Sequence, residues 1–445
     1  FHNVLCLSEA KGMDINMKKS IAVLLACAMT LSMAACGSDS SNSSNASSSE
    51  PKTESTESST KNDESTPAGD EEKDYSGYTI RIYSNSNSTE RATWLTNVAK
   101  DAGFTISMDD NSVISGDVAA IQAANENKDG DLIFGLNETR WSQLVNGTYE
   151  NLKLADWTPS WADQVGEYAY PGKAYGLVIQ NVLMLYRTDD LGTNGQELHF
   201  KHWSDLVDCG YTWYRQNKVG GTTNSNINSA MLYSYVDPSS EAGGISVDGW
   251  KMLWKYCAEG KSGGDDYKYG FVPLNMGYVQ VSTFYSSSLY GQIDAAAESS
   301  EHPLVGTMDP ENWALVDIDD GTYYIAEYIG VLDKEGRSEE ETEAVKAFAE
   351  WFGSADVQAA WGEEFDSYPC NEAAAAILYP DGVPEIYTLP NFALATVEGG
   401  GTYADYVAAH SSEWTNIMTN LGFYWADDSS AVAEPDWDNL DWATL

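Results

Sequence analysis

The feature that most constrains the fold is a regular alternation of strand and helix patterns between residues 78 and 145. Alternating apolar and polar residues predict three strands, at 78–83, 104–108 and 131–135. Helical spacing predicts helices between and after them, at 89–102, after Asp117, and after Thr139, which we expect to act as the N-cap. Strands joined through helices run parallel, because the chain must return to the same end of the sheet. We therefore expect an α/β fold with mostly parallel sheets covered by helices.

Later segments continue the pattern. Four more have strand character: 173–179, 182–186, 313–317 and 323–332. Three more have the spacing of amphipathic helices: 246–258, 339–352 and 402–421. The turn that ends at Gly321, between the last two strands, predicts a hairpin. The acidic residues after Ala426 are expected to be loose.

The N-terminal region has the pattern of a secretory signal. Lys18 and Lys19 precede an uncharged apolar stretch at 21–35, which is short for a membrane-spanning helix. Two alanines then precede Cys36, and small residues there give a peptidase access to the backbone before a thiol that can carry a lipid. We predict upstream read-through at 1–16, a lipoprotein signal peptide at 17–35 and lipidation of Cys36. The true start codon stays open.

The residues after Cys36 are unlike those of a folded domain. Residues 37–73 are rich in Ser, Thr and acidic residues and contain no aromatic residue, Leu, Ile or Val. Such a segment cannot bury enough apolar surface to offset the entropy of ordering it. We predict a lipidated cysteine and disordered tether at 36–73, with a reach of roughly 35 Å.

The remaining chain is long enough for two lobes. We expect a discontinuous lobe 1, a lobe 2 core and two C-terminal pieces. The expected bounds are 74–185 and about 290–372 for lobe 1, 186–289 for lobe 2, 373–425 for a C-terminal helical segment and 426–445 for an acidic tail.

Charge and cysteine content exclude several classes of protein. The chain has 24 basic and 68 acidic residues, a formal net charge of −44, so it repels nucleic acid and anionic lipid. Membrane contact is expected only through the lipid anchor, and the protein is expected to be a monomer. Cys209, Cys257 and Cys370 match no disulfide framework or zinc motif, and whether two of them form a disulfide stays open.

Catalytic and metal motifs are missing from the sequence. It contains neither the His-Glu-x-x-His motif nor the Gly-x-Ser-x-Gly nucleophile elbow. His199 and His202 offer two metal ligands without a third Cys or His nearby, which favours a solvated loop. We predict no catalytic residue, no metal site and no cofactor. A pair of catalytic carboxylates among the many acidic residues stays open.

Polar residues follow the first and third predicted strands, where parallel sheets bind ligands. A small solute is expected there, between two lobes, and a carboxylate at Glu138 would favour a cation. Each asparagine could equally be a helix cap or a turn residue. The candidate ligand-binding residues are Asn85, Ser86, Asn87, Asn137, Glu138, Asn181, Asn224, Ser225, Asn226, Tyr323 and Tyr324.

In their order along the chain, several motifs resemble a known family. They are the signal with its tether, residues 131–137 followed by a helix, 203–207, 344–351 with 354–358, and Tyr368-Pro369. Together they resemble the solute-binding proteins of ABC importers, nearest the branch that handles thiamine, iron(III) and polyamines. The resemblance implies the two-lobed type II periplasmic-binding fold, with a ligand cleft between the lobes. The chain departs from the iron pattern, because the only late Tyr-Tyr pair is Tyr323-Tyr324, beside the predicted hairpin.

We therefore predict a lipid-anchored solute-binding protein on the outer face of the cell membrane, which delivers a small molecule to an ABC permease. The predicted solute is a cationic organic molecule or a sugar, with iron(III) less favoured, and its identity stays open. We do not expect an enzyme. The alternative is a surface-anchored enzyme, such as a carboxylate-dependent glycoside hydrolase, acting on extracellular polymer.

Overall fold

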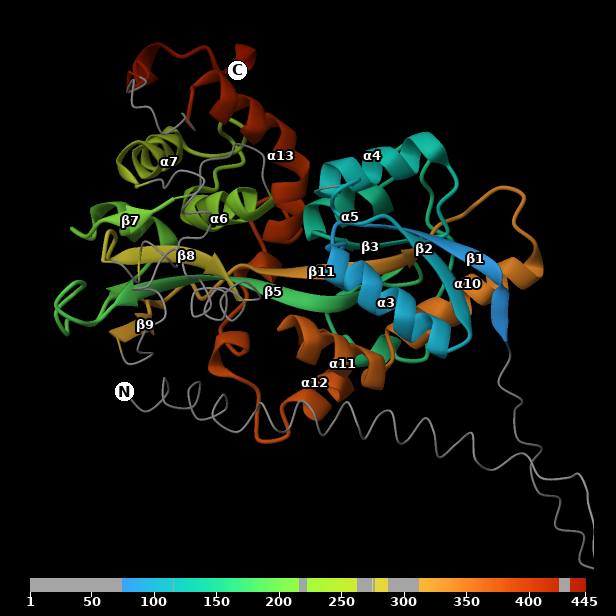
Figure 1. The fold of residues 1–445 in the computed structure, drawn as a ribbon. Helices are drawn as coiled ribbons and strands as arrows, with labels where there is room; N and C mark the ends of the chain where they lie inside the picture. Colours follow the sequence, from blue (N-terminus) through green and yellow to red (C-terminus); the bar gives the residue numbers. More distant parts are fainter. Residues whose placement is uncertain are drawn as a thin grey trace, which may run out of the picture. The chain divides into compact units, whose positions relative to one another are not determined.

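The computed structural model describes residues 74–114, 116–215, 222–261, 274, 277–286, 312–423 and 433–445. The predicted read-through, signal peptide, Cys36 and tether lie outside these ranges. So do residues 426–432 of the predicted acidic tail. Residues 74–445 belong to one unit, whose elements are shown in Figure 1.

The strands of this unit are β1 (Tyr75–Ser84), β2 (Phe104–Met108), β3 (Leu132–Leu136), β4 (Ala169–Tyr170), β5 (Ala174–Arg187), β6 (His199–Phe200), β7 (Trp213–Tyr214), β8 (Val281–Tyr285), β9 (Trp313–Leu315), β10 (Asp317–Ile318), β11 (Tyr324–Val331) and β12 (Tyr368–Pro369). The α-helices are α3 (Thr89–Asp101), α4 (Asp117–Asn127), α5 (Glu138–Val145), α6 (Thr222–Leu232), α7 (Val247–Glu259), α10 (Glu339–Phe352), α11 (Ala355–Phe365), α12 (Glu372–Leu378) and α13 (Tyr403–Asn420).

The main sheet has the strand order β2-β1-β3-β11-β5-β8-β7. Strands β1, β2 and β3 are parallel, as are β7 and β8. Strand β11 runs antiparallel to both β3 and β5, and β5 runs antiparallel to β8. The expected α/β class is confirmed. The sheet is mixed, because the antiparallel strands β5 and β11 lie between the parallel group β1, β2 and β3 and the parallel pair β7 and β8 (Figure 1).

Three local predictions are wrong. The strands predicted at 173–179 and 182–186 form the single strand β5, Ala174–Arg187, because the polar pair Gln180 and Asn181 continues the ladder with β11. The turn at Gly321 does not make a hairpin, since β10 pairs with β6 whereas β11 pairs with β3 and β5. The N-cap of α5 is Asn137, two residues before Thr139, and its side chain accepts a hydrogen bond from the Arg140 N–H.

The helices predicted at 339–352 and 402–421 are confirmed, and the structure shows how each begins. Helix α10 spans residues 339–352, and its capping box joins Ser338 to Glu341. Helix α13 begins after the N-cap Thr402, which forms a second capping box with Asp405. Local signals of this kind predict helix ends well, because the cap satisfies backbone N–H groups that have no partner inside the helix.

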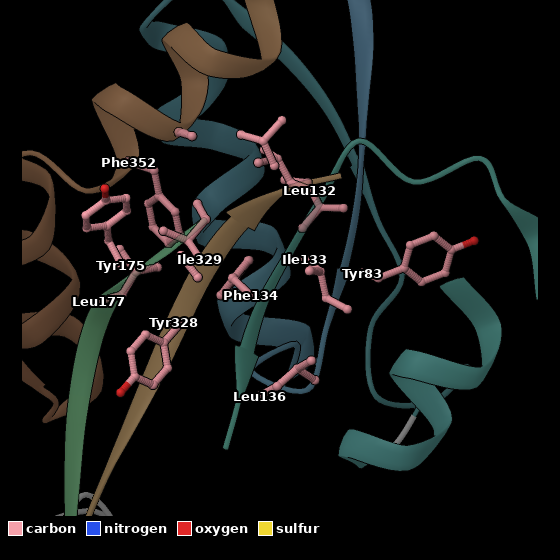
Figure 2. Close-up of a cluster of buried hydrophobic side chains, with 14 of the residues drawn as sticks. Tyr83, Leu132, Ile133, Phe134, Leu136, Tyr175, Leu177, Tyr328, Ile329 and Phe352 are labelled. Carbon is pink, nitrogen blue, oxygen red and sulfur yellow. The ribbon is translucent and has the colours of Figure 1, made fainter. Parts of the chain in front are cut away.

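One hydrophobic core lies among β1, β2, β3, β11 and the first half of β5. Strand residues such as Phe134 and Ile329 pack there against Phe348 and Phe352 of α10. Figure 2 shows Tyr175 and Leu177 of β5 beside Phe352, with the hydroxyl of Tyr328 pointing away from these apolar side chains. We call this cluster the first core.

A second core is built by the other half of the unit. It joins Val182 on β5 to Trp203, to Leu253 on α7, and to Tyr403 and Trp414 on α13. The C-terminal residues 433–445 are not loose as expected. Their apolar side chains pack against this core, and the Asn420 side chain donates to the Leu445 carbonyl at 2.7 Å. We call this cluster the second core.

Two adjacent strands carry the chain between the cores (Figure 1). On β5, Ile179 belongs to the first core and Val182 to the second. At the start of β11 the two cores alternate, because Tyr323, just before the strand, and Ile325 pack into the second core and Tyr324 into the first. Opposite-facing neighbours are expected in a strand, where successive side chains alternate.

A third connection follows β12 and is tied to those two strands. The side-chain amide of Asn181 and the hydroxyl of Tyr324 both donate to the carbonyl oxygen of Ile386, the latter at 3.2 Å. The Thr322 N–H donates to the Pro390 carbonyl at 2.8 Å. These bonds make the junction between the cores a single hydrogen-bonded unit.

The three cysteines outside the N-terminal region are free, so none of them forms a disulfide. Cys257 and Cys370 are buried, and Cys209 is partly buried. Within the described ranges, no helix combines the length and the hydropathy that crossing a membrane requires.

Candidate functional site

The register of the parallel strands places the predicted polar clusters at one edge of the sheet. Tyr83 pairs with Ile133 and Ser84 with Phe134, so β1 and β3 end side by side. Ser86 and Glu138 follow these two ends. Both are nearly buried, with 3% and 4% of their surfaces exposed.

Glu138 is the first residue of α5, and its carboxylate is only half satisfied. The Tyr328 hydroxyl of β11 donates to Oε1 at 3.0 Å, whereas Oε2 is buried without a hydrogen-bond partner. Burial raises the pKa of Glu138 to about 8, and hydrogen bonding from the Tyr328 hydroxyl and, more weakly, from the Ala326 backbone opposes this rise. An unpaired buried carboxylate is costly, so such a group either binds a proton or needs a cation.

A second carboxylate lies nearby on β11. The Ser86 hydroxyl donates to one oxygen of Glu327 at 2.5 Å, and the Gln180 side-chain amide donates to the other at 2.5 Å. Burial raises the pKa of Glu327, and the positive charge of Arg91 opposes this rise.

Glu327 and Tyr328 are consecutive on β11 and have different partners. Glu327 accepts from Ser86 and Gln180 and responds to the charge of Arg91 on α3. Tyr328 contacts Glu138 and Trp141 of α5. Successive side chains of a strand point to opposite faces of the sheet, so the two residues serve different surroundings.

Aromatic hydroxyl groups surround Glu138. Burial raises the pKa values of Tyr170, Tyr323 and Tyr328, and the charge of Glu138 adds to the rise at each of them. Tyr323 belongs to the second core, so residues of both cores meet at this carboxylate. We call Glu138, Tyr170, Tyr323 and Tyr328 the acidic tyrosine site.

Some predicted site residues support the fold around this site. Asn87 donates to the carbonyls of Asp109 and Ile114 at 3.0 and 2.9 Å and so holds the loop after β2. Asn137 caps α5.

The other predicted residues are distributed over the junction and the second core. Asn181 and Tyr324 join the connections between the cores, and Asn226 donates from α6 to the Tyr285 hydroxyl on β8. Asn85 and Ser225 are partly buried, and the side chain of Asn224 lies outside the described part of the chain.

Sequence reasoning missed Glu327, Tyr328 and Tyr170. Glu327 is the only charged residue in the strand pattern at 323–332, and a charge in an otherwise apolar strand was the available signal. No local pattern marks Tyr170 or Tyr328, because their role depends on the pairing of β4 and β11 with β5.

The site has no obvious metal chemistry. Among the described residues, no group of three or more His, Cys, Asp and Glu side chains could hold a metal ion. The adjacent Tyr323 and Tyr324 cannot chelate one ion as a pair, since they pack into different cores.

Glu138 is enclosed by neighbouring side chains. A pocket of about 340 Å³ within the described residues lies elsewhere, on α12, lined in part by Tyr368, Glu372 and Tyr379. Since only 4% of the surface of Glu138 is exposed, we expect a solute to reach it through a movement of the surrounding elements.

Comparison with known proteins decides the family. Residues 93–392 match the model of the bacterial extracellular solute-binding proteins. The chain belongs to this family. A relative that is 26% identical over 305 residues, covering 67% of this chain and 76% of its own, is described as a probable ABC transporter periplasmic-binding protein of Sinorhizobium fredii.

Solved structures agree on the fold of this solute-binding protein. Apo ferric ion-binding protein A of Pasteurella haemolytica has a TM-score of 0.56 at 15% identity and covers 79% of this chain and 99% of its own. Iron-bound HitA of Pseudomonas aeruginosa has a TM-score of 0.55 at 14% identity and covers 76% and 98%. The two-lobed architecture of periplasmic-binding proteins expected from the sequence is thus confirmed, and at such low identity the likeness concerns the fold alone.

Membership gives the general function. The chain is a solute-binding protein of an ABC transporter, a class that works outside the cytoplasm with a small-molecule ligand and a permease partner. Nothing in the family match favours the alternative of a polymer-degrading enzyme.

Proposed function

We propose that this solute-binding protein captures a small cationic organic solute at the acidic tyrosine site and delivers it to its ABC permease without chemical change. The observation that carries the proposal is the buried, unpartnered oxygen of Glu138. A cation placed there would compensate the buried charge, and the tyrosine rings around it offer negative π faces that attract a cation.

Other solutes are less well served by this site. A sugar needs several donors and acceptors, but both oxygens of Glu327 are already occupied by Ser86 and Gln180. The solved structure of HitA is iron-bound, yet Tyr323 and Tyr324 here face different cores. The proposal therefore keeps a sugar as the competing solute and gives iron(III) the lowest rank.

Placement in the cell is part of the same proposal. Cys36 would be lipidated, and residues 37–73 would let the binding unit work close to the outer face of the membrane. The domain bounds expected from the sequence, including lobe 1 at 74–185 and about 290–372, also remain proposals.

The test is a thermal-shift screen with organic cations, sugars and ferric citrate, followed by calorimetry of each hit on the Glu138→Gln variant. The substitution should weaken binding of an organic cation at least tenfold, about 1.4 kcal/mol, because the amide lacks the negative charge. Glu413→Gln, at an exposed acid on α13, is the matched control and should bind normally. An anionic or sugar ligand, or unchanged affinity in Glu138→Gln, would refute the cation proposal.

A further inference from the structure

Helix α13 covers the part of α5 that carries Glu138. The two helices pack against each other, although α13 supplies Tyr403 and Trp414 to the second core and α5 supplies Trp141 to the first (Figure 1). The contact therefore joins the two halves of the molecule. Helix α13 also follows the end of the family match at residue 392.

Polar residues of α5 near Glu138 are buried. Thr139 and Ser142 have 8% and 5% of their surfaces exposed. Ser142 lies one turn after Glu138, on the same side of the helix. Asp405, on the first turn of α13, lies close enough for its charge to act on Glu138. The packing of α13 on α5 therefore encloses a carboxylate.

The groups around Glu138 do not neutralise it. Oε1 accepts from the neutral Tyr328 hydroxyl, and Oε2 has no partner. The charge of Asp405, on the first turn of α13, disfavours the ionised form of Glu138, as does that of Glu167 before β4. The remaining titratable groups that respond to its charge are Tyr168 and Tyr170, Tyr323 just before β11, and Cys370 after β12.

We propose that α13 is a lid which closes on α5 only when Glu138 is neutralised, by a proton in the empty protein and by the cationic solute in the loaded one. Closing over an ionised, unpaired carboxylate would remove it from water without compensation and bring it toward Asp405. A proton or a cation removes both costs. Solute binding displaces the proton. In the solute-free protein, closure requires that proton, so the lid is harder to close as the pH rises.

The proposal about solute rests on the proposed function, but the proton response does not, and it is measured without any solute. Spin labels are introduced as non-canonical amino acids at two exposed positions of the full chain, Glu126 on α4 and Ser412 on α13. Their distance distribution reports the closed and open populations. The closed-to-open ratio should fall about tenfold per pH unit between pH 6 and about 8, because closure takes up one proton.

Three variants fix the sign of the effect. Glu138→Gln, which is always neutral, should stay closed at every pH. At pH 8.5, Asp405→Asn should be more closed than the wild type because a repelling charge is gone, and Tyr328→Phe more open because the ionised form loses its donor. Glu413→Gln, at an exposed acid farther along α13, should behave as the wild type.

The opposite signs of Asp405→Asn and Tyr328→Phe keep the test decisive even if Glu138→Gln folds poorly. A wild-type distance that is the same at pH 6 and 8.5 would overturn the lid, as would opening of Glu138→Gln in parallel with the wild type. A clear pH response in a protein that binds no organic cation would leave the lid standing and remove only the cation.

Discussion

At the scale of single residues, function and stability are opposed at Glu138. The residue is 4% exposed, and its pKa rises from 4.5 to about 8 because burial disfavours the charged form. Between these two pH values the folded state therefore binds a proton that the unfolded state has released. Stability is full below about pH 4.5 and falls as the pH rises toward 8, because the folded state must then give up that proton.

Replacing this residue gives a prediction about stability in the absence of solute. Glu138→Gln should unfold at a higher temperature than the wild type at pH 8.5, since the amide carries no charge to bury. At pH 4.5 the two proteins should be nearly alike, because the wild-type carboxyl is then neutral as well. Calorimetric unfolding at both pH values measures the difference. A variant that is less stable at pH 8.5 would mean that Glu138 is satisfied in the folded state.

At the scale of secondary-structure elements, a buried ion pair fastens the other end of the same strands. Asp131, which precedes β3, is fully buried and accepts from Arg337 at 2.8 Å, from Lys334 at 3.2 Å, and from the Tyr78 hydroxyl of β1 at 2.9 Å. Arg337 lies between β11 and α10, so the carboxylate joins β1, β3 and the β11–α10 turn. Asp131 is paired with positive charges, whereas Glu138, at the other end of the strands, is not. This contrast supports a structural role for Asp131 and a binding role for Glu138.

Breaking this pair should be costly. Arg337→Met would leave a buried carboxylate with less compensation and should lower the free energy of unfolding by about 3–5 kcal/mol. Lys173→Met removes a lysine from an exposed pair with Asp156 and should change stability by about 1 kcal/mol or less. Urea unfolding of the two variants makes the comparison, and equal losses would show that Arg337 contributes no more than a surface charge.

At the scale of the whole molecule, two cores joined by three connections favour a hinge. Ile386 accepts from both Asn181 and Tyr324, so the junction is held together while the cores on either side can rotate about it. The lid proposed for α13 is the contact that such a rotation would open or close. A lipid anchor at Cys36 would place this motion next to the permease.

Anchoring gives a prediction for the intact protein in its cell. Cys36→Ala removes the thiol that would carry the lipid, so the protein should leave the membrane fraction for the medium or stay unprocessed. Immunoblots of membrane and medium fractions measure the distribution. Ser40→Ala, a short way into the tether, is the control and should stay with the membrane. Membrane retention of the Cys36→Ala protein would exclude the anchor.

The sequence by itself determined the elements whose signals are local. Ser88, Ser338 and Thr402 cap the helices that follow them, because a cap acts within one turn of its own chain. The alternation of strand and helix was enough to place Ser86 and Glu138 at one edge, since parallel strands end together. The family resemblance rested on motifs that are equally local.

Only the tertiary structure decided what those residues contact. The sequence could not show that β5 runs unbroken through Asn181, nor that Tyr328 of β11 meets Glu138, because both depend on pairing with distant strands. Glu138 contacts Tyr328 of β11 and responds to the charge of Asp405 on α13, about 190 and more than 250 residues further along the chain. The raised pKa of Glu138 follows from its burial, so no pattern around residue 138 could have predicted it.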